Sequence, residues 1–191
     1  VPHSVDVQPI VEDITMSNTL LESVVKKNRA RLIPFMLALY VLAFLDRSNI
    51  GFAKETYQLD TGLSNEAYAL GAGIFFVVYA FLGVPANLLM RKFGARKWIG
   101  CTTLLWGILS AAMAWADTEA KFLLVRTLLG AAEAGFFPGM IYLTSQWFPQ
   151  QNRASIMGLF YMGAPLALTL GSPLSGALLE MHGFMGHPGW F

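Results

Sequence analysis

Long stretches without charged side chains dominate the pattern of polar and apolar positions along the chain. Segments 67–90, 98–116 and 154–179 contain no Asp, Glu, Lys or Arg, and segments 32–52 and 122–148 carry only two such residues each. An α-helix needs about 20 apolar residues to cross the hydrocarbon core of a bilayer. The pattern therefore predicts an all-α membrane protein. Its five transmembrane helices are expected near 32–52, 67–90, 97–116, 121–146 and 154–179.

The overall composition excludes several other classes of protein. Hydrophobic residues make up 55% of the chain and charged residues only 13%, whereas a water-soluble domain carries about 25% charged residues. The basic and acidic residues nearly cancel, which gives no reason to expect binding to nucleic acid. The single cysteine, Cys101, and three scattered histidines lack the spacing of a metal site. We expect no metal, no cofactor and no enzymatic activity.

The two ends of the chain differ from its apolar middle. Residues 1–31 are polar and mixed, so a flexible cytoplasmic tail is expected there. Met16 is a plausible native start, which would make residues 1–15 an upstream extension. After Leu179 a short loop ends in two residues that resemble the start of another helix. Five helices leave one apolar face without a partner, so segment 32–191 is expected to be part of a six-helix bundle in a longer protein.

The positions of the basic residues predict the orientation in the membrane. Four basic residues precede the first predicted helix, four lie between the second and third, and one lies between the fourth and fifth. The opposite loops contain only Lys54 and Lys121. Basic loops stay on the cytoplasmic side. A multi-pass protein of the plasma membrane with a cytoplasmic N-terminus is therefore expected.

Four charged residues fall inside the predicted helices: Asp46, Arg47, Arg126 and Glu133. A charge at the bilayer centre costs about 2.5–3.5 kcal/mol on insertion scales, so these side chains must face protein or a water-filled cavity. Arg126 and Glu133 lie seven residues apart, within about 20° of one helix face. They form either an ion pair that only fixes packing or a site for protons and anions.

The other candidate positions also leave two interpretations open. Asp46 and Arg47 are adjacent and point about 100° apart, so they cannot share one neighbour. They either face the interior or extend to water at the membrane edge. Tyr79, near the middle of the second helix, is either an ordinary core tyrosine or a hydrogen-bond donor to a substrate. Gly130, on the face of Arg126, leaves room for another helix or for a ligand.

Several segments resemble a known family. Segment 45–53, LDRSNIGFA, resembles the signature of the anion:cation symporter family within the major facilitator superfamily. Residues 126–134 contain the R-x-x-x-G-x-x-x-A pattern of the fourth helix, and segments 132–142, 147–149 and 181–190 also match. Segment 83–97 occupies the place of the cytoplasmic loop motif, although Arg91 stands where the superfamily has an acidic residue.

This resemblance implies a protein of twelve helices in two six-helix halves, with alternating access to a central site. The chain would supply the first five helices, and the missing C-terminal half would complete the pathway. The implied activity is proton-coupled uptake of a small organic anion, a sugar acid such as L-rhamnonate. Arg47 would bind the substrate carboxylate with Tyr79 nearby. Asp46 and Glu133 would carry protons, and Arg126 would be the partner of Glu133.

Three other functions are weighed against uptake. A membrane sensor would bind solute without moving it and could dispense with Asp46 and Glu133. An intramembrane enzyme could use paired carboxylates, but no nucleophile–base arrangement supports one. A drug/proton antiporter is the nearest alternative, although Arg47 and Arg126 favour an anionic substrate over a cationic drug. The expected partners are therefore an organic anion, protons and the lipid bilayer.

Overall fold

The computed structural model describes residues 8–180, and the side chains of residues 16–180. Five segments are long and apolar enough to cross a membrane, which confirms the predicted all-α class and number of spans within the described part. They run over Met16–Phe52, Asn65–Phe93, Ala95–Trp115, Glu119–Trp147 and Gln150–Glu180. The elements are α1 (Gln8–Phe52), α2 (Lys54–Thr61), α3 (Asn65–Phe93), α4 (Ala95–Ala112), the 3₁₀ turn η1 (Met113–Trp115), α5 (Glu119–Glu133), α6 (Phe136–Trp147), α7 (Gln150–Tyr161) and α8 (Gly163–Glu180).

The N-terminal segment is helical where a flexible tail was expected. Helix α1 begins at Gln8 and runs without a break into the first span, so the described part of segment 1–31 is continuous with it. No glycine or proline lies between Pro9 and Pro34, and the backbone is therefore free to stay helical despite its polar side chains. The expected start of a sixth helix lies outside the described residues.

The fourth and fifth spans are each broken into two helices, which the hydropathy pattern did not predict. The breaks fall at Ala134–Gly135 and at Met162. Proline lacks a backbone N–H, so Pro138 and Pro165 leave the carbonyls four residues earlier without a helical donor. Each proline then lies in the first turn of the following helix, where a missing N–H is tolerated.

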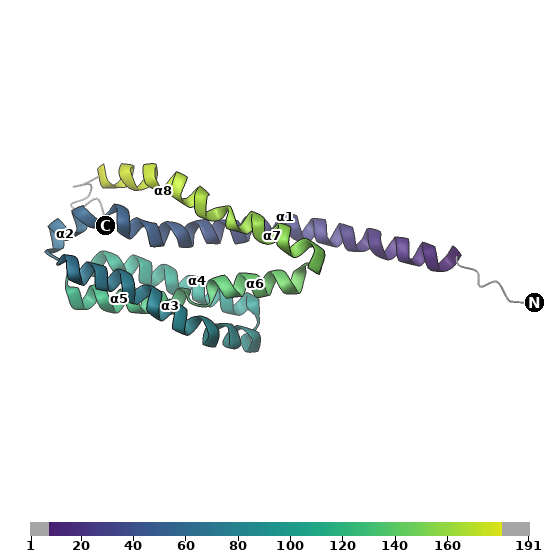
Figure 1. Cartoon of the computed structure of the whole chain (residues 1–191), viewed down its shortest axis with the longest axis horizontal. Coiled ribbons are helices and arrows are strands. Elements are labelled where there is room, and N and C mark those ends of the chain that lie inside the picture. Colours follow the sequence, from purple (N-terminus) through teal and green to yellow (C-terminus); the bar gives the residue numbers. More distant parts are fainter. Residues whose placement is uncertain (1–7, 181–191) are drawn as a thin grey trace, which may run out of the picture.

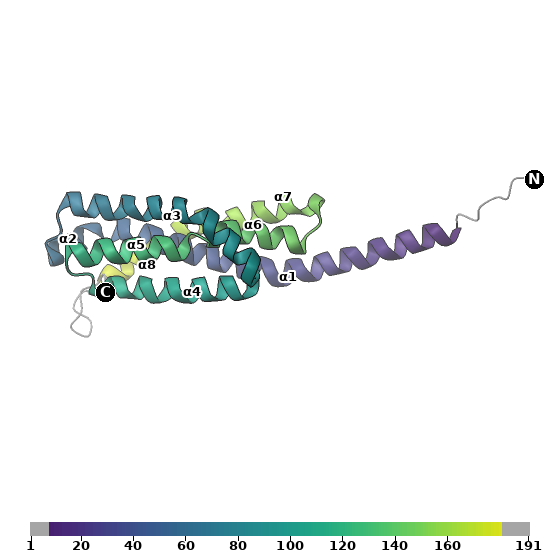
Figure 2. The same ribbon diagram turned by 90° about the horizontal axis from the view of Figure 1, so that it is seen from below.

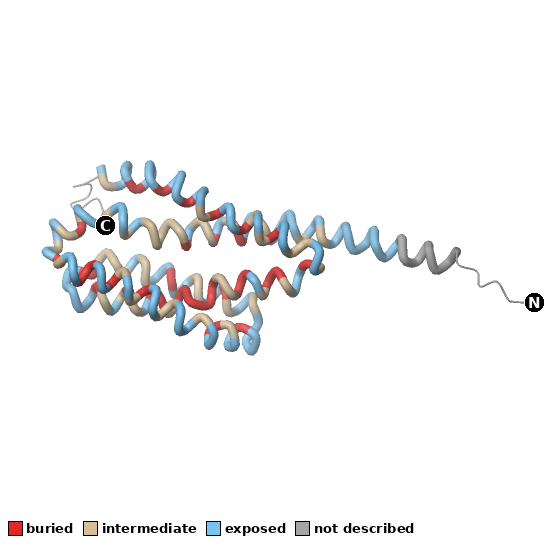
Figure 3. Tube along the Cα trace, viewed as in Figure 1, coloured by how far each residue is buried: buried red, intermediate tan, exposed pale blue. Residues whose placement is uncertain are grey.

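Two groups of closely packed helices lie at the centre of the bundle. Helix α3 packs along α5, and α1 packs along α7 and α8, as Figures 1 and 2 show. Glycine permits both approaches: a Cβ added at Gly130 would lie 2.6 Å from the carbonyl oxygen of Phe75, and one added at Gly171 would lie 2.6 Å from Cδ2 of Leu45. The room predicted at Gly130 is therefore filled by another helix. The fourth span, which consists of α5 and α6, is the most buried of the five (Figure 3).

Candidate functional site

An ion pair between the first and fourth spans lies at the centre of the site. Nε and Nη2 of Arg47 each lie 2.7 Å from Oε2 of Glu133, whose side chain is 0% exposed. Glu133 is the last residue of α5, where the negative end of the helix dipole disfavours a carboxylate. A charge buried in this way needs a partner, and Arg47 on α1 supplies it.

Arg126 is not the partner of Glu133, which corrects the sequence interpretation. Its Nε donates to the carbonyl oxygen of Gly71 at 3.4 Å, and in the described part of the chain it forms no ion pair. Seven residues along one helix separate the two side chains by about 10 Å, whereas α1 brings Arg47 into direct contact. Arg126 is nevertheless buried, with 3% of its surface exposed.

Aromatic rings lie between the two arginines. Cζ of Arg126 is 4.6 Å from the ring centroid of Phe75, and Cζ of Arg47 is 5.5 Å from the same centroid. Phe75 stacks on Tyr79, whose ring centroid lies 4.5 Å from Cζ of Arg47. The π-faces attract both guanidinium groups and keep the two positive charges apart. The structure thus places Tyr79 beside Arg47.

Asp46 and Arg126 line the same cavity. The hydroxyl of Ser110 donates to Oδ1 of Asp46, while Oδ2 is buried and has no hydrogen-bond partner among the described residues. Asp46 therefore faces helix α4 inside the bundle, where it accepts from Ser110, whereas Arg47 donates to Glu133. The cavity has a volume of about 450 Å³. Its polar lining consists of Asp46, Asn49, Tyr57, Tyr68, Ser110 and Arg126.

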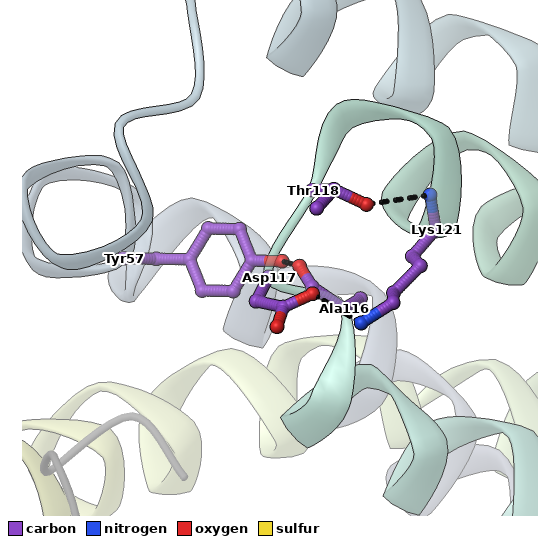
Figure 4. Close-up of polar contacts among 5 residues, drawn as sticks. All are labelled: Tyr57, Ala116, Asp117, Thr118 and Lys121. Atoms are coloured by element: carbon purple, nitrogen blue, oxygen red, sulfur yellow. Dashed lines mark hydrogen bonds and ion pairs between the residues drawn. The ribbon is translucent and has the colours of Figure 1, made fainter.

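The short helix α2 covers one end of this cavity. The hydroxyl of Tyr57 on α2 donates to the carbonyl oxygen of Ala116, in the loop between the third and fourth spans (Figure 4). Burial, together with nearby Asp117, raises the pKa of Tyr57 to about 12. In the same loop Nζ of Lys121 lies 2.5 Å from Oδ1 of Asp117, and this hydrogen bond holds the pKa of Asp117 below its ordinary value.

Several residues of the site were missed by sequence reasoning, among them Ser110 and Phe75. Ser110 gave a weak signal, as a hydroxyl residue in an apolar span, but serine is common in membrane helices and often bonds to its own backbone. Phe75 gave no signal, because nothing in the sequence distinguishes it from the many other phenylalanines of the chain. Only the packing of α1, α3 and α5 shows that Phe75 lies between Arg47 and Arg126.

The arrangement combines two acid–base sets of different character. In the first, Arg47 and Glu133 are paired and enclosed by aromatic rings. In the second, Asp46 and Arg126 line a cavity with space for a small molecule or water. A paired arginine can exchange one carboxylate partner for another, since its planar fork fits any carboxylate. Arg47 is therefore suited to binding an anion in competition with Glu133.

The sequence of this chain is similar to those of known transport proteins. Residues 36–190 match the sequence profile of the Major Facilitator Superfamily. Inner membrane transport protein RhmT of Escherichia coli (strain K12) is 92% identical over 176 residues, which cover 92% of this chain and 41% of that protein. A proposed tartrate transporter of Agrobacterium vitis is 50% identical, over 94% of this chain and 40% of that protein. The chain thus spans about two fifths of these relatives.

A solved structure with the same fold is a bacterial homologue of the human lysosomal transporter Spinster, in an inward-facing and occupied conformation. The two superpose with a TM-score of 0.76 at 23% identity, over 81% of this chain and 34% of that one. At this level of identity the likeness shows the fold alone.

Proposed function

Because this chain belongs to the Major Facilitator Superfamily, we propose that it forms the amino-terminal part of a proton-coupled symporter for a small organic anion. The observation that carries the proposal is the ion pair between Arg47 and the fully buried Glu133. Ionisable groups inside membrane spans are expensive and mark pathways for ions and substrates. The remainder of the protein would supply the other half of an alternating-access pathway.

The proposed substrate is a sugar acid such as L-rhamnonate. Arg47 would bind its carboxylate, since a guanidinium presents two parallel N–H donors and keeps its charge at any working pH. The ring of Tyr79 lies against Arg47 and would border the bound anion. A relative that is 50% identical to this chain is a proposed transporter of another hydroxy acid, tartrate.

The pairing of Arg47 with Glu133 suggests how a proton would accompany each anion. While Glu133 is ionised, it occupies the guanidinium that a substrate carboxylate would need. A proton on Glu133 removes that competitor, and the incoming carboxylate then restores the charge balance of Arg47. Proton and anion would favour each other's binding, which by linkage is a reciprocal coupling. Asp46, which faces Arg126 across the cavity, would be the second proton carrier.

The proposed setting is the bacterial inner membrane, crossed several times. The basic residues before the first span and between the second and third favour a cytoplasmic N-terminus. In this orientation α2 and the loop at Asp117 face the opposite side. Two variants, Glu55→Cys and Asn28→Cys, test the orientation when each is treated with a membrane-impermeant thiol reagent. Labelling of Asn28→Cys in intact cells would contradict it.

Uptake by the full-length protein in proteoliposomes tests the coupling role of Glu133. With an imposed proton gradient, the parent protein should accumulate the sugar acid. Glu133→Gln, which mimics the protonated acid, should still bind and exchange substrate but should lose accumulation and its pH dependence. Glu66→Gln is the matched control, because Glu66 is an exposed acid at the start of α3. Normal gradient-driven accumulation by Glu133→Gln would remove Glu133 from coupling.

A second variant tests Arg47 as the substrate ligand. Arg47→Lys keeps the positive charge but loses the planar fork. We expect substrate affinity to fall by about tenfold, which corresponds to the loss of about one charge-assisted hydrogen bond. Substrate titration of tryptophan fluorescence measures this. Unchanged affinity would exclude Arg47 from the binding site, and saturable binding without any flux in the parent protein would favour a sensor instead.

A further inference from the structure

The N-terminal part of α1 extends well beyond the helix bundle (Figures 1 and 2). The first span covers Met16–Phe52, 37 residues, whereas about 20 suffice to cross the hydrocarbon core. Were α1 to stay straight, Met16 would lie about 24 Å beyond Leu32, outside the headgroup layer. The tube in Figure 3 shows this described part of α1 as almost wholly exposed.

This extension carries large apolar side chains that nothing in the described structure covers. Leu20 is 62% exposed and Val24 is 52% exposed, and Met16 and Leu21 are exposed as well. Met16, Leu20 and Val24 recur every four residues, so that successive side chains lie about 40° apart and form one stripe. In water such a stripe leaves apolar surface unburied, and exposed apolar surface of this kind marks an interaction site.

The charges of the same segment are arranged around this stripe. Residues 16–31 contain four basic side chains and one acidic one. Lys27 and Arg31 project on the side of the stripe, and their long stems can lie on apolar surface while the charged ends reach lipid phosphates. Lys26 and Arg29 project about 120–180° from Leu20, on the opposite side. An apolar stripe whose basic side chains can reach lipid phosphates allows a helix to lie in the interfacial plane of a membrane.

A proline marks where the segment could change direction. Pro34 lies inside α1, just after the last basic residue, Arg31. Having no N–H, it leaves the carbonyl of Ala30 without its helical donor, and its ring crowds that carbonyl. Kinks in helices are found at such positions. The weak point therefore separates the polar segment from the membrane-crossing part of α1.

We propose that segment 16–31 is an interfacial helix that bends at Pro34 and docks on the anionic lipid surface of the membrane that α1 crosses. The stripe of Met16, Leu20 and Val24 enters the boundary between headgroups and acyl chains. Lys27 and Arg31 bind lipid phosphates, and the opposite face stays in water. Each basic residue near an anionic surface adds a favourable electrostatic contribution that salt screens.

Spin labels on the full-length protein in phospholipid vesicles test this docking. In a Cys101→Ala background, Leu20→Cys reports the stripe and Asn18→Cys reports nearly the opposite face at the same level. In vesicles that contain phosphatidylglycerol, the label at position 20 should be reached by oxygen and shielded from a water-soluble nickel chelate. The label at position 18 should show the reverse. Equal access of the chelate to both labels would overturn the proposal.

Lipid charge and the basic residues provide the second arm of the experiment. Lys27→Gln/Arg31→Gln should lower the ratio of docked to free segment by roughly thirtyfold, as expected for the loss of two surface cations. The matched control, Lys26→Gln/Arg29→Gln, removes the same charge from the opposite face and should have a clearly smaller effect. Pro34→Ala should also reduce docking. A label at position 20 that is immobile and shielded from both probes, whatever the lipid charge, would show packing on protein and overturn the proposal.

Discussion

Asp46 and Arg47 are neighbours in sequence but lie in different surroundings. Arg47 contacts the fully buried Glu133 and two aromatic rings, and 20% of its side chain is exposed. Asp46 has one hydrogen bond, from Ser110, and borders a cavity of about 450 Å³ that it shares with Arg126. One turn of α1 therefore serves an enclosed ion pair on one side and an open polar cavity on the other.

The difference shows how two acid–base sets can coexist in one small bundle. Phe75, which is fully buried, lies within 5.5 Å of Cζ of Arg47 and 4.6 Å of Cζ of Arg126, so one ring contacts both guanidinium groups. The enclosed pair should contribute to folding as well as to function, because each partner is costly without the other. The open set should tolerate change better, since water can solvate an unpaired group in the cavity.

Removal of Arg47 should give the largest effect on stability. Arg47→Ala leaves Glu133 buried and unpaired, and we expect a loss of about 3–5 kcal/mol in the free energy of unfolding. Asp46→Ala removes one hydrogen bond and should cost about 1 kcal/mol. Thermal unfolding of the full-length protein in detergent measures both. Arg47→Ala/Glu133→Gln should recover part of the loss, and equal costs for the two single variants would contradict the comparison.

The substitution Gly130→Ala should give the next largest loss of stability. The new Cβ would lie 2.6 Å from the carbonyl oxygen of Phe75, and backbone cannot rotate away. Gly130→Ala should therefore push α3 from α5, displace the ring between the arginines, and cost about 1–3 kcal/mol. Gly171→Ala is the control, since its Cβ meets the flexible side chain of Leu45. Thermal unfolding in detergent measures both losses of stability. A larger loss for Gly171→Ala than for Gly130→Ala would contradict the tight contact expected between Gly130 and the backbone of Phe75.

The fold was largely predictable because hydropathy reports directly on the need to bury apolar surface in lipid. The five spans follow from it, but their details do not. Pro138 and Pro165 lie next to helix breaks, whereas Pro85 and Pro173 lie inside continuous helices. The presence of a proline in a span therefore does not by itself predict a break. The long helical start of α1 was missed because polar composition was taken as a sign of irregular structure.

The candidate site was predictable in its members but not in its pairing. The cost of burying charge in a membrane points to Asp46, Arg47, Arg126 and Glu133 without any structure. Helical spacing then favoured a pair within one helix, and that expectation was wrong. The actual partner depends on how α1 packs against α5, through contacts far apart in sequence, and no local pattern encodes them.

The smallest expected effect concerns the outer wall of the open cavity. Tyr57 lines that cavity and donates to Ala116, and burial raises its pKa from an ordinary value of 10.0 to about 12. A raised pKa stabilises the fold fully below pH 10, and this contribution, about 1 kcal/mol, is lost as the pH rises through 12. Tyr57→Phe should lower the unfolding temperature at pH 9 and converge with the parent protein near pH 12. Tyr161→Phe, at an exposed position, serves as the control. If the plots of unfolding temperature against pH for Tyr57→Phe and the parent protein stay parallel from pH 9 to 12, protonated Tyr57 does not anchor α2.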